Sequence, residues 1–160
     1  MIKNKKILVV GAGGFIGGHL VKKFLNDGNS IIAKQIYEKL GCNVTSLFDE
    51  LDGNFPNHHP DPSKEENMED LKNVVLEKSL DLGIAFDGDA DRLGIVTKKG
   101  SIIDADIQML AFSKEILKQN QGGKIVFDVK CSKLLSDGIE ELGGVPLINP
   151  TGHSLIKKRL

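Results

Sequence analysis

Short apolar runs alternate along the chain with longer segments in which apolar residues recur every third or fourth position. Continuous apolar runs are typical of buried strands, and they predict strands over 5–10, 44–48, 82–86, 93–97, 124–129 and 145–148. The helical period predicts helices over 15–27, 30–41, 62–78, 106–119 and 132–142, with another starting at Leu155. This alternation predicts an α/β fold with mixed, largely parallel sheets in α/β/α layers.

The same pattern predicts which face of each helix is buried. In the helix over 30–41, Ile32, Ile36 and Leu40 recur at every fourth position, which is the spacing that predicts this helix. The expected inner faces of the next two helices consist of Leu71, Val74 and Val75, and of Ile107, Leu110, Ala111 and Leu117.

A loop interrupts this pattern over residues 52–62. Pro56, Pro60 and Pro62 fall within seven residues, which rules out a helix or a central strand there. The loop also contains His58 and His59, a pair that suggests a metal site. Adjacent side chains point apart on a regular backbone, which argues against a shared metal ion.

Composition narrows the class of protein. Apolar residues make up 40% of the 160 residues and charged residues 27%, as in soluble globular domains. A net charge of −1 gives no electrostatic reason to expect a nucleic acid or an anionic membrane. The first apolar run is too short for a signal peptide or a membrane span, so we expect a cytoplasmic protein. Cys42 and Cys131 have no metal-ligand spacing and are predicted to be reduced thiols.

The most informative segment is the acidic loop after the predicted strand 82–86. Asp87, Asp89 and Asp91 occupy alternate positions, and Arg92 follows them. Three like charges in a tight loop repel one another unless they fan into water or share a cation. Mg²⁺ takes oxygen ligands, which makes this segment a candidate magnesium loop. The alternative is a solvated acidic turn, because Asp and Gly are ordinary turn residues.

The spacing of the aspartates excludes one known loop and fits another poorly. An EF-hand loop that begins at Asp87 needs Gly at its sixth position and Glu at its twelfth, where this chain has Arg92 and Lys98. A haloacid-dehalogenase-like phosphatase has Asp-x-Asp-x-Thr after a strand, and the fifth position here is Asp91.

A second motif lies near the start of the chain. Gly11, Gly14 and Gly17 follow a predicted strand and precede a predicted helix, the context in which glycines let the backbone approach a pyrophosphate. Residues 3–28 resemble an extended short-chain dehydrogenase/reductase, a nucleotide-sugar epimerase or dehydratase, which implies NAD at these glycines. No acidic second strand follows, and position 41, where Tyr37 would need its partner Lys, is Gly. The favoured interpretation is therefore a strand and a helix that have only a structural role. The alternative is an NAD-binding fragment of a nucleotide-sugar epimerase or dehydratase.

Residues 28–160 resemble the α-D-phosphohexomutase family, that is, phosphomannomutase/phosphoglucomutase. Four ordered motifs carry the resemblance: Gly41-Cys42 with residues 52–62, the acidic loop 87–92, residues 128–132 and residues 151–157. The resemblance implies Mg²⁺ held by Asp87, Asp89 and Asp91, and a hexose phosphate substrate (mannose or glucose 1-/6-phosphate). It implies catalytic roles for Arg92, Lys130 and His153. Without the resemblance, Lys130 is a solvated strand-end lysine and His153 a turn residue.

The resemblance also implies a domain division, with a dehydrogenase-like unit over 1–28, a second mutase domain over 29–100 and part of a third over 101–160. The family's Thr-Ala-Ser-His-Asn-Pro serine loop is not found in the sequence. We therefore expect an incomplete mutase fragment with little turnover of its own. Apolar surface at Leu155, Ile156 and Leu160 favours self-association.

Overall fold

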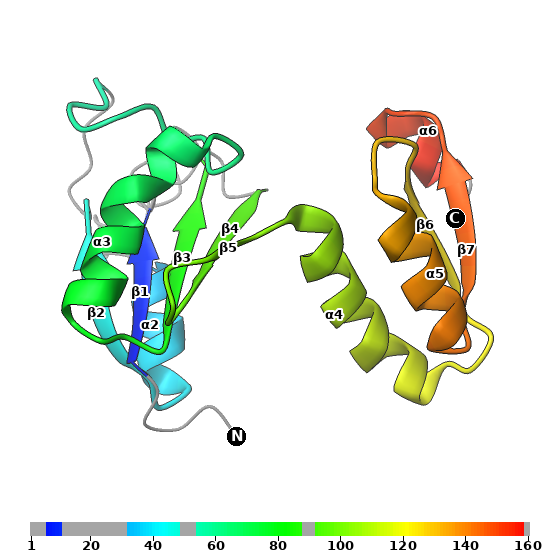
Figure 1. Cartoon of the computed structure of the whole chain (residues 1–160), viewed down its shortest axis with the longest axis horizontal. Coiled ribbons are helices and arrows are strands. Elements are labelled where there is room, and N and C mark those ends of the chain that lie inside the picture. Colours follow the sequence, from blue (N-terminus) through cyan, green and yellow to red (C-terminus); the bar gives the residue numbers. More distant parts are fainter. Residues whose placement is uncertain (1–5, 11–31, 49–53, 88–91, 159–160) are drawn as a thin grey trace. The chain divides into compact units, whose positions relative to one another are not determined.

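The computed structural model describes residues 6–10, 32–48, 54–87 and 92–158 (Figure 1). The chain divides into two compact units, Met1–Ile103 and Asp104–Leu160. The glycines Gly11, Gly14 and Gly17 and the helix expected over 15–27 lie outside the described residues. In the part of the chain that is described, no helix has the length and apolar character that a membrane crossing requires.

The first unit is built on a five-stranded mixed sheet. Its strands are β1 (Lys6–Val10), β2 (Asn43–Leu47), β3 (Leu82–Phe86), β4 (Leu93–Thr97) and β5 (Ile102–Ile103), in the order β2-β1-β3-β4-β5. Strand β1 pairs in parallel with both β2 and β3, whereas β4 is antiparallel to β3 and β5. The first predicted strand is therefore an inner strand of this sheet.

Helices α2 (Ile32–Lys39) and α3 (Glu69–Glu77) cover opposite faces of the sheet, and a 3₁₀ turn (Glu65–Met68) leads into α3. Side chains alternate along a strand, and β3 shows the consequence. Ala85 belongs to a buried cluster with Leu71 and Val75 of α3, whereas Ile84 packs with Cys42 on the α2 side. The expected α/β/α layering is confirmed, as is the predicted inner face of α3.

The apolar residues that mark α2 in the sequence are not the ones that pack on the sheet. Ile36 and Leu40 are 50% and 46% exposed, and the residues that pack on the sheet are Ala33 and Tyr37. Ala33 and Tyr37 have the same four-residue spacing as Ile36 and Leu40. In a helix of two turns, that spacing does not single out one face.

The second unit is built on two parallel strands. Its elements are α4 (Ala105–Gln119), β6 (Lys124–Asp128), α5 (Lys133–Glu141), β7 (Val145–Asn149) and α6 (His153–Lys157). Its buried core consists of Leu117, Ile125, Phe127, Leu135 and Ile139. The strands and helices expected here are confirmed to within two residues at their ends, and the largest difference is the start of α6, at His153 rather than Leu155.

Helix α4 contacts α5 through a narrower face than the sequence predicts. Leu117 is buried and Leu110 packs on the core, as expected, but Ile107 and Ala111 are exposed. A Cβ atom on Gly138 of α5 would lie 2.7 Å from Leu110 Cδ1. The bare backbone at Gly138 therefore lets the two helices meet closely along this one line of contact, which leaves the flanking positions of α4 uncovered.

Candidate functional site

The candidate site of the first unit begins where β3 ends. Strand β3 is buried along its middle positions, and Asp87 follows its last residue directly. Asp87 is only 1% exposed. The chain then returns into the antiparallel β4, so residues 87–92 form the connection between these two strands. Asp89 and Asp91 lie outside the described residues.

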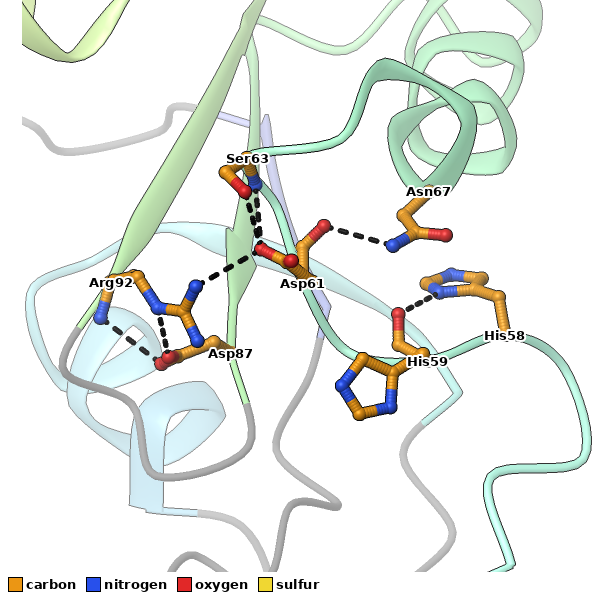
Figure 2. A network of polar contacts seen from close by, with 7 residues as sticks. All are labelled: His58, His59, Asp61, Ser63, Asn67, Asp87 and Arg92. Carbon is orange, nitrogen blue, oxygen red and sulfur yellow. Dashed lines mark hydrogen bonds and ion pairs between the residues drawn. The ribbon is translucent and has the colours of Figure 1, made fainter.

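Arg92 holds the buried carboxylate of Asp87 through two hydrogen bonds. Its backbone N–H donates to Oδ1 at 3.0 Å, and its side-chain Nε donates to Oδ2 at 2.6 Å (Figure 2). The backbone N–H of Asp87 in turn donates to the carbonyl of Arg92 at 3.3 Å. A buried charge is costly unless it is paired and hydrogen-bonded, and Arg92 meets both conditions.

A third residue, Asp61, completes this network from a distant part of the sequence. Arg92 Nη1 lies 3.2 Å from Asp61 Oδ1, so the guanidinium bridges two carboxylates. The same Oδ1 accepts hydrogen bonds from the Ser63 hydroxyl at 2.6 Å and from the Ser63 N–H at 3.2 Å. The Ser63 hydroxyl, with help from the charges of Arg92 and Lys64, holds the pKa of Asp61 below its usual range. Asp61 was not predicted as a site residue from the sequence. The feature that could have indicated it is a charged residue placed between two prolines.

The two adjacent histidines are directed to different neighbours. His58 Nδ1 lies 3.0 Å from the carbonyl oxygen of His59 (Figure 2). The His58 ring stacks edge-on against Phe48, and the His59 ring stacks against Phe55. Within the described ranges, no three His, Cys, Asp or Glu side chains gather as metal ligands would. The two histidine rings therefore lie against different aromatic side chains.

The second unit brings two of the sequence motifs together at the carboxyl ends of its parallel strands. Asp128, the last residue of β6, accepts hydrogen bonds at Oδ1 from the Lys130 N–H at 2.9 Å and from the Thr151 hydroxyl at 2.8 Å. Its pKa is lowered, chiefly by the Lys130 N–H. Lys130 itself is exposed, and His153 is the first residue of α6. One carboxylate therefore links the loop that carries Lys130 to the turn that precedes His153.

A further carboxylate joins the starts of the two long helices of this unit. Asp106, in the first turn of α4, accepts hydrogen bonds from the Ser132 N–H at 3.1 Å and the Ile107 N–H at 3.0 Å. The interaction with Ser132 is the main cause of a lowered pKa at Asp106. Asp106, Asp128 and Thr151 were not among the expected site residues. The sequence feature that could have indicated Asp128 is its place at a strand end, and for Asp106 it is its place in a first helical turn.

Comparison with known proteins shows what this architecture is similar to. The family model described as phosphoglucomutase/phosphomannomutase, alpha/beta/alpha domain II, matches residues 10–100, and that of domain III matches residues 104–160. The phosphomannomutase/phosphoglucomutase of Pseudomonas syringae pv. tomato is 53% identical over 135 residues, which cover 84% of this chain and 29% of the relative. The phosphoglucomutase of Neisseria gonorrhoeae is 49% identical over 139 residues, which cover 85% of this chain and 30% of the relative.

A solved structure of this family also matches the chain. The crystal structure of a phosphoglucomutase/phosphomannomutase family protein from Burkholderia thailandensis superposes with a TM-score of 0.84 at 41% identity, covering 99% of this chain and 32% of that one. This chain thus spans about a third of the length of such proteins. The domain II match begins at residue 10 and includes Gly11, Gly14 and Gly17. The resemblance of these glycines to an NAD-binding dehydrogenase is therefore not supported.

Proposed function

Because the chain belongs to the phosphoglucomutase/phosphomannomutase family, we propose that it supplies the Mg²⁺-binding loop and part of the sugar-facing surface of a hexose phosphate mutase. The observation that carries the proposal is the buried, Arg92-paired carboxylate of Asp87 at the end of β3. We propose that Asp87, Asp89 and Asp91 hold the ion. A donor set made only of carboxylate oxygens fits Mg²⁺, which is a hard cation.

The chemistry that such a site supplies is electrostatic. Transfer of a phosphoryl group requires positioning and the stabilisation of negative charge, with little covalent chemistry from the protein. Bound Mg²⁺ would neutralise part of that charge. Arg92 is suited to the same task because its guanidinium is permanently charged and has N–H groups on several sides. Its side chain is 57% exposed although Nε and Nη1 are engaged by carboxylates, so part of it faces solvent.

The second unit contributes the proposed contacts with the sugar. Lys130 follows β6 and His153 begins α6, and the Asp128–Thr151 hydrogen bond ties their loops together. An exposed ammonium can donate hydrogen bonds to sugar hydroxyls and assist proton transfer there. We propose Lys130 as this group and His153 as a second sugar-facing residue. The substrates suggested by the relatives' names are mannose and glucose phosphates.

Turnover is proposed for the whole protein, because this chain spans about a third of the length of its relatives. No serine of the chain stands in the family's serine-loop sequence, so none is proposed as the phosphoryl carrier. The property to test in the chain itself is therefore cation binding.

Titration calorimetry of Mg²⁺ into the full chain tests the proposal. We expect binding of modest affinity, weaker than micromolar, and a loss of at least about tenfold in the Asp87→Asn variant, which removes a charged ligand while keeping its shape. The matched control is Asp70→Asn, the same change at an exposed position of α3. Equal affinity in the wild-type and Asp87→Asn chains, both shown to be folded by circular dichroism, would contradict the proposal.

A further inference from the structure

We infer that Asp61 is a positioning residue, which holds the guanidinium of Arg92 and thereby sets how strongly Asp87 binds a divalent cation. The part of this inference that concerns the cation rests on the proposed function. The part that concerns the placement of Arg92 does not. Asp61 contributes no ligand in this account, and its influence passes through Arg92.

The geometry around Arg92 suggests this role. The Arg92 side chain is 57% exposed, whereas its two partners are nearly enclosed, Asp61 at 16% and Asp87 at 0% side-chain exposure. A long, exposed side chain ordinarily samples several rotamers, and fixing it costs entropy. Here Nε is 2.6 Å from Asp87 and Nη1 is 3.2 Å from Asp61, so two carboxylates on different segments define the plane of the guanidinium (Figure 2).

Asp61 is itself held in place before it meets Arg92. Its Oδ1 accepts hydrogen bonds from the N–H and the hydroxyl of Ser63, and its backbone carbonyl accepts one from Asn67 Nδ2 at 2.9 Å. Pro60 and Pro62 on either side restrict the backbone. The carboxylate is therefore a fixed point, and of the two partners in this ion pair it is Arg92 that would otherwise move.

The consequence for the cation follows from the sharing of charge. With Asp61 present, the positive charge of Arg92 is divided between two carboxylates. Without it, no second carboxylate offsets the charge of Arg92, so the guanidinium repels a cation at Asp87 more strongly although it is held by one carboxylate instead of two. Interactions between unit charges within about a Debye length, roughly 10 Å, change affinities by a few-fold at ordinary salt. We expect Asp61→Asn to weaken Mg²⁺ binding about three- to tenfold.

The placement of Arg92 can be measured without any cation. In the ¹⁵N-labelled full chain, the Nε–Hε group of Arg92 gives its own nuclear magnetic resonance signal. We expect Asp61→Asn to lower the heteronuclear NOE of this signal and to speed its exchange with water several-fold. The control variant Asp70→Asn carries the same loss of charge on α3 and should leave the signal unchanged. Asn keeps the shape of Asp61, and its amide oxygen can still accept the hydrogen bonds from Ser63, so the Asp61→Asn chain is expected to fold.

A double-mutant cycle then separates an effect through Arg92 from simple loss of charge. Mg²⁺ affinity is measured in the wild type, Asp61→Asn, Arg92→Gln and the double variant. We expect Asp61→Asn to weaken binding when Arg92 is present and to change it less than about twofold in the Arg92→Gln chain. Equal weakening in both backgrounds, or an Arg92 Nε–Hε signal that Asp61→Asn leaves unchanged, overturns the inference. If no chain binds Mg²⁺, the proposed function fails, and the Arg92 signal still decides whether Asp61 positions the side chain.

Discussion

Gly83, in the middle of β3, is the position at which the packing beneath Asp87 can be tested most sharply. A Cβ atom added there would lie 2.8 Å from Val75 Cγ2 and 2.9 Å from Leu71 Cδ1, both on α3. Carbon atoms pack best at separations of about 3.5–4.0 Å. Val75 and Leu71 are 0% and 1% exposed, so neither side chain can turn into solvent to make room. Gly83→Ala therefore has to push α3 away from the sheet.

The expected cost is the difference between two opposing effects. Overpacking of a buried core costs about 1–3 kcal/mol. Replacing Gly by Ala in a strand gains roughly 0.5–1 kcal/mol, because Ala loses less backbone entropy on folding. We expect a net loss of about 1 kcal/mol in the free energy of unfolding of the first unit.

Tyrosine fluorescence during urea unfolding reports this unit selectively. Tyr37 is the only tyrosine in the chain, and the chain has no tryptophan. Tyr37 lies on α2 and packs on the face of the sheet opposite α3, so the Gly83→Ala change does not touch the probe. The control is Gly122→Ala in the second unit, where an added Cβ meets nothing within 4 Å and the positive φ of 74° makes any loss of stability one of that unit. It should leave the tyrosine transition unchanged.

A second substitution identifies the clash as the cause. Val75→Ala removes the methyl group at 2.8 Å, so the Gly83→Ala/Val75→Ala chain should be more stable than the sum of the single effects predicts, by at least about 0.5 kcal/mol. A Gly83→Ala chain as stable as the wild type, or strictly additive effects in the double variant, would refute the packing described for β3 and α3.

Three further outcomes are expected in the second unit. Leu135→Ala, at a fully buried position, should destabilise this unit by about 2–5 kcal/mol, measured by circular dichroism, and leave the Tyr37 transition in place. Thr151→Val should loosen the loop of Lys130, whereas Thr151→Ser, which keeps the hydroxyl that donates to Asp128, should not; amide hydrogen exchange at Lys130 distinguishes the two. The pKa of Asp106 is lowered in the folded chain, so its stabilising contribution is complete above the ordinary value of 3.8 and is lost as pH falls through the lowered pKa. Urea unfolding of wild type and Asp106→Asn should therefore differ most near neutral pH and converge as pH falls through the lowered pKa, and a constant difference would contradict the role of Asp106.

The strands could be predicted from the sequence because each is a short apolar run bounded by polar or glycine residues. Strand β3 is predicted to the residue, since Leu82–Phe86 stops abruptly at Asp87. The helix starts were harder to predict. The pattern begins a helix at Pro62, but the chain makes a turn at Asp61–Ser63 and a 3₁₀ segment before α3 starts at Glu69. The side-chain hydrogen bonds of Asp61 and Ser63 compete there with helical ones.

Local patterns also could not reveal which side chains meet across the fold. Arg92 lies beside the aspartates in the sequence, so its proximity to Asp87 was open to prediction. Its pairing with Asp61, 31 positions earlier, depends on where the loop before α3 crosses the end of β3. The link between Asp128 and Thr151 likewise needs β6 and β7 to lie side by side in parallel. In both places the sequence supplied the residues and the sheet topology brought them together.

The central claim, a divalent cation at the end of β3, is tested most directly by Mn²⁺ added in small amounts to the ¹⁵N-labelled chain. Mn²⁺ accepts the same oxygen ligands as Mg²⁺ and broadens the resonances of nearby amides. We expect broadening centred on residues 87–92, extending to Asp61 and Ser63, reversed by excess Mg²⁺ and absent in Asp87→Asn. Broadening centred elsewhere, for instance on His58 and His59, or broadening that Asp87→Asn leaves intact, would contradict it.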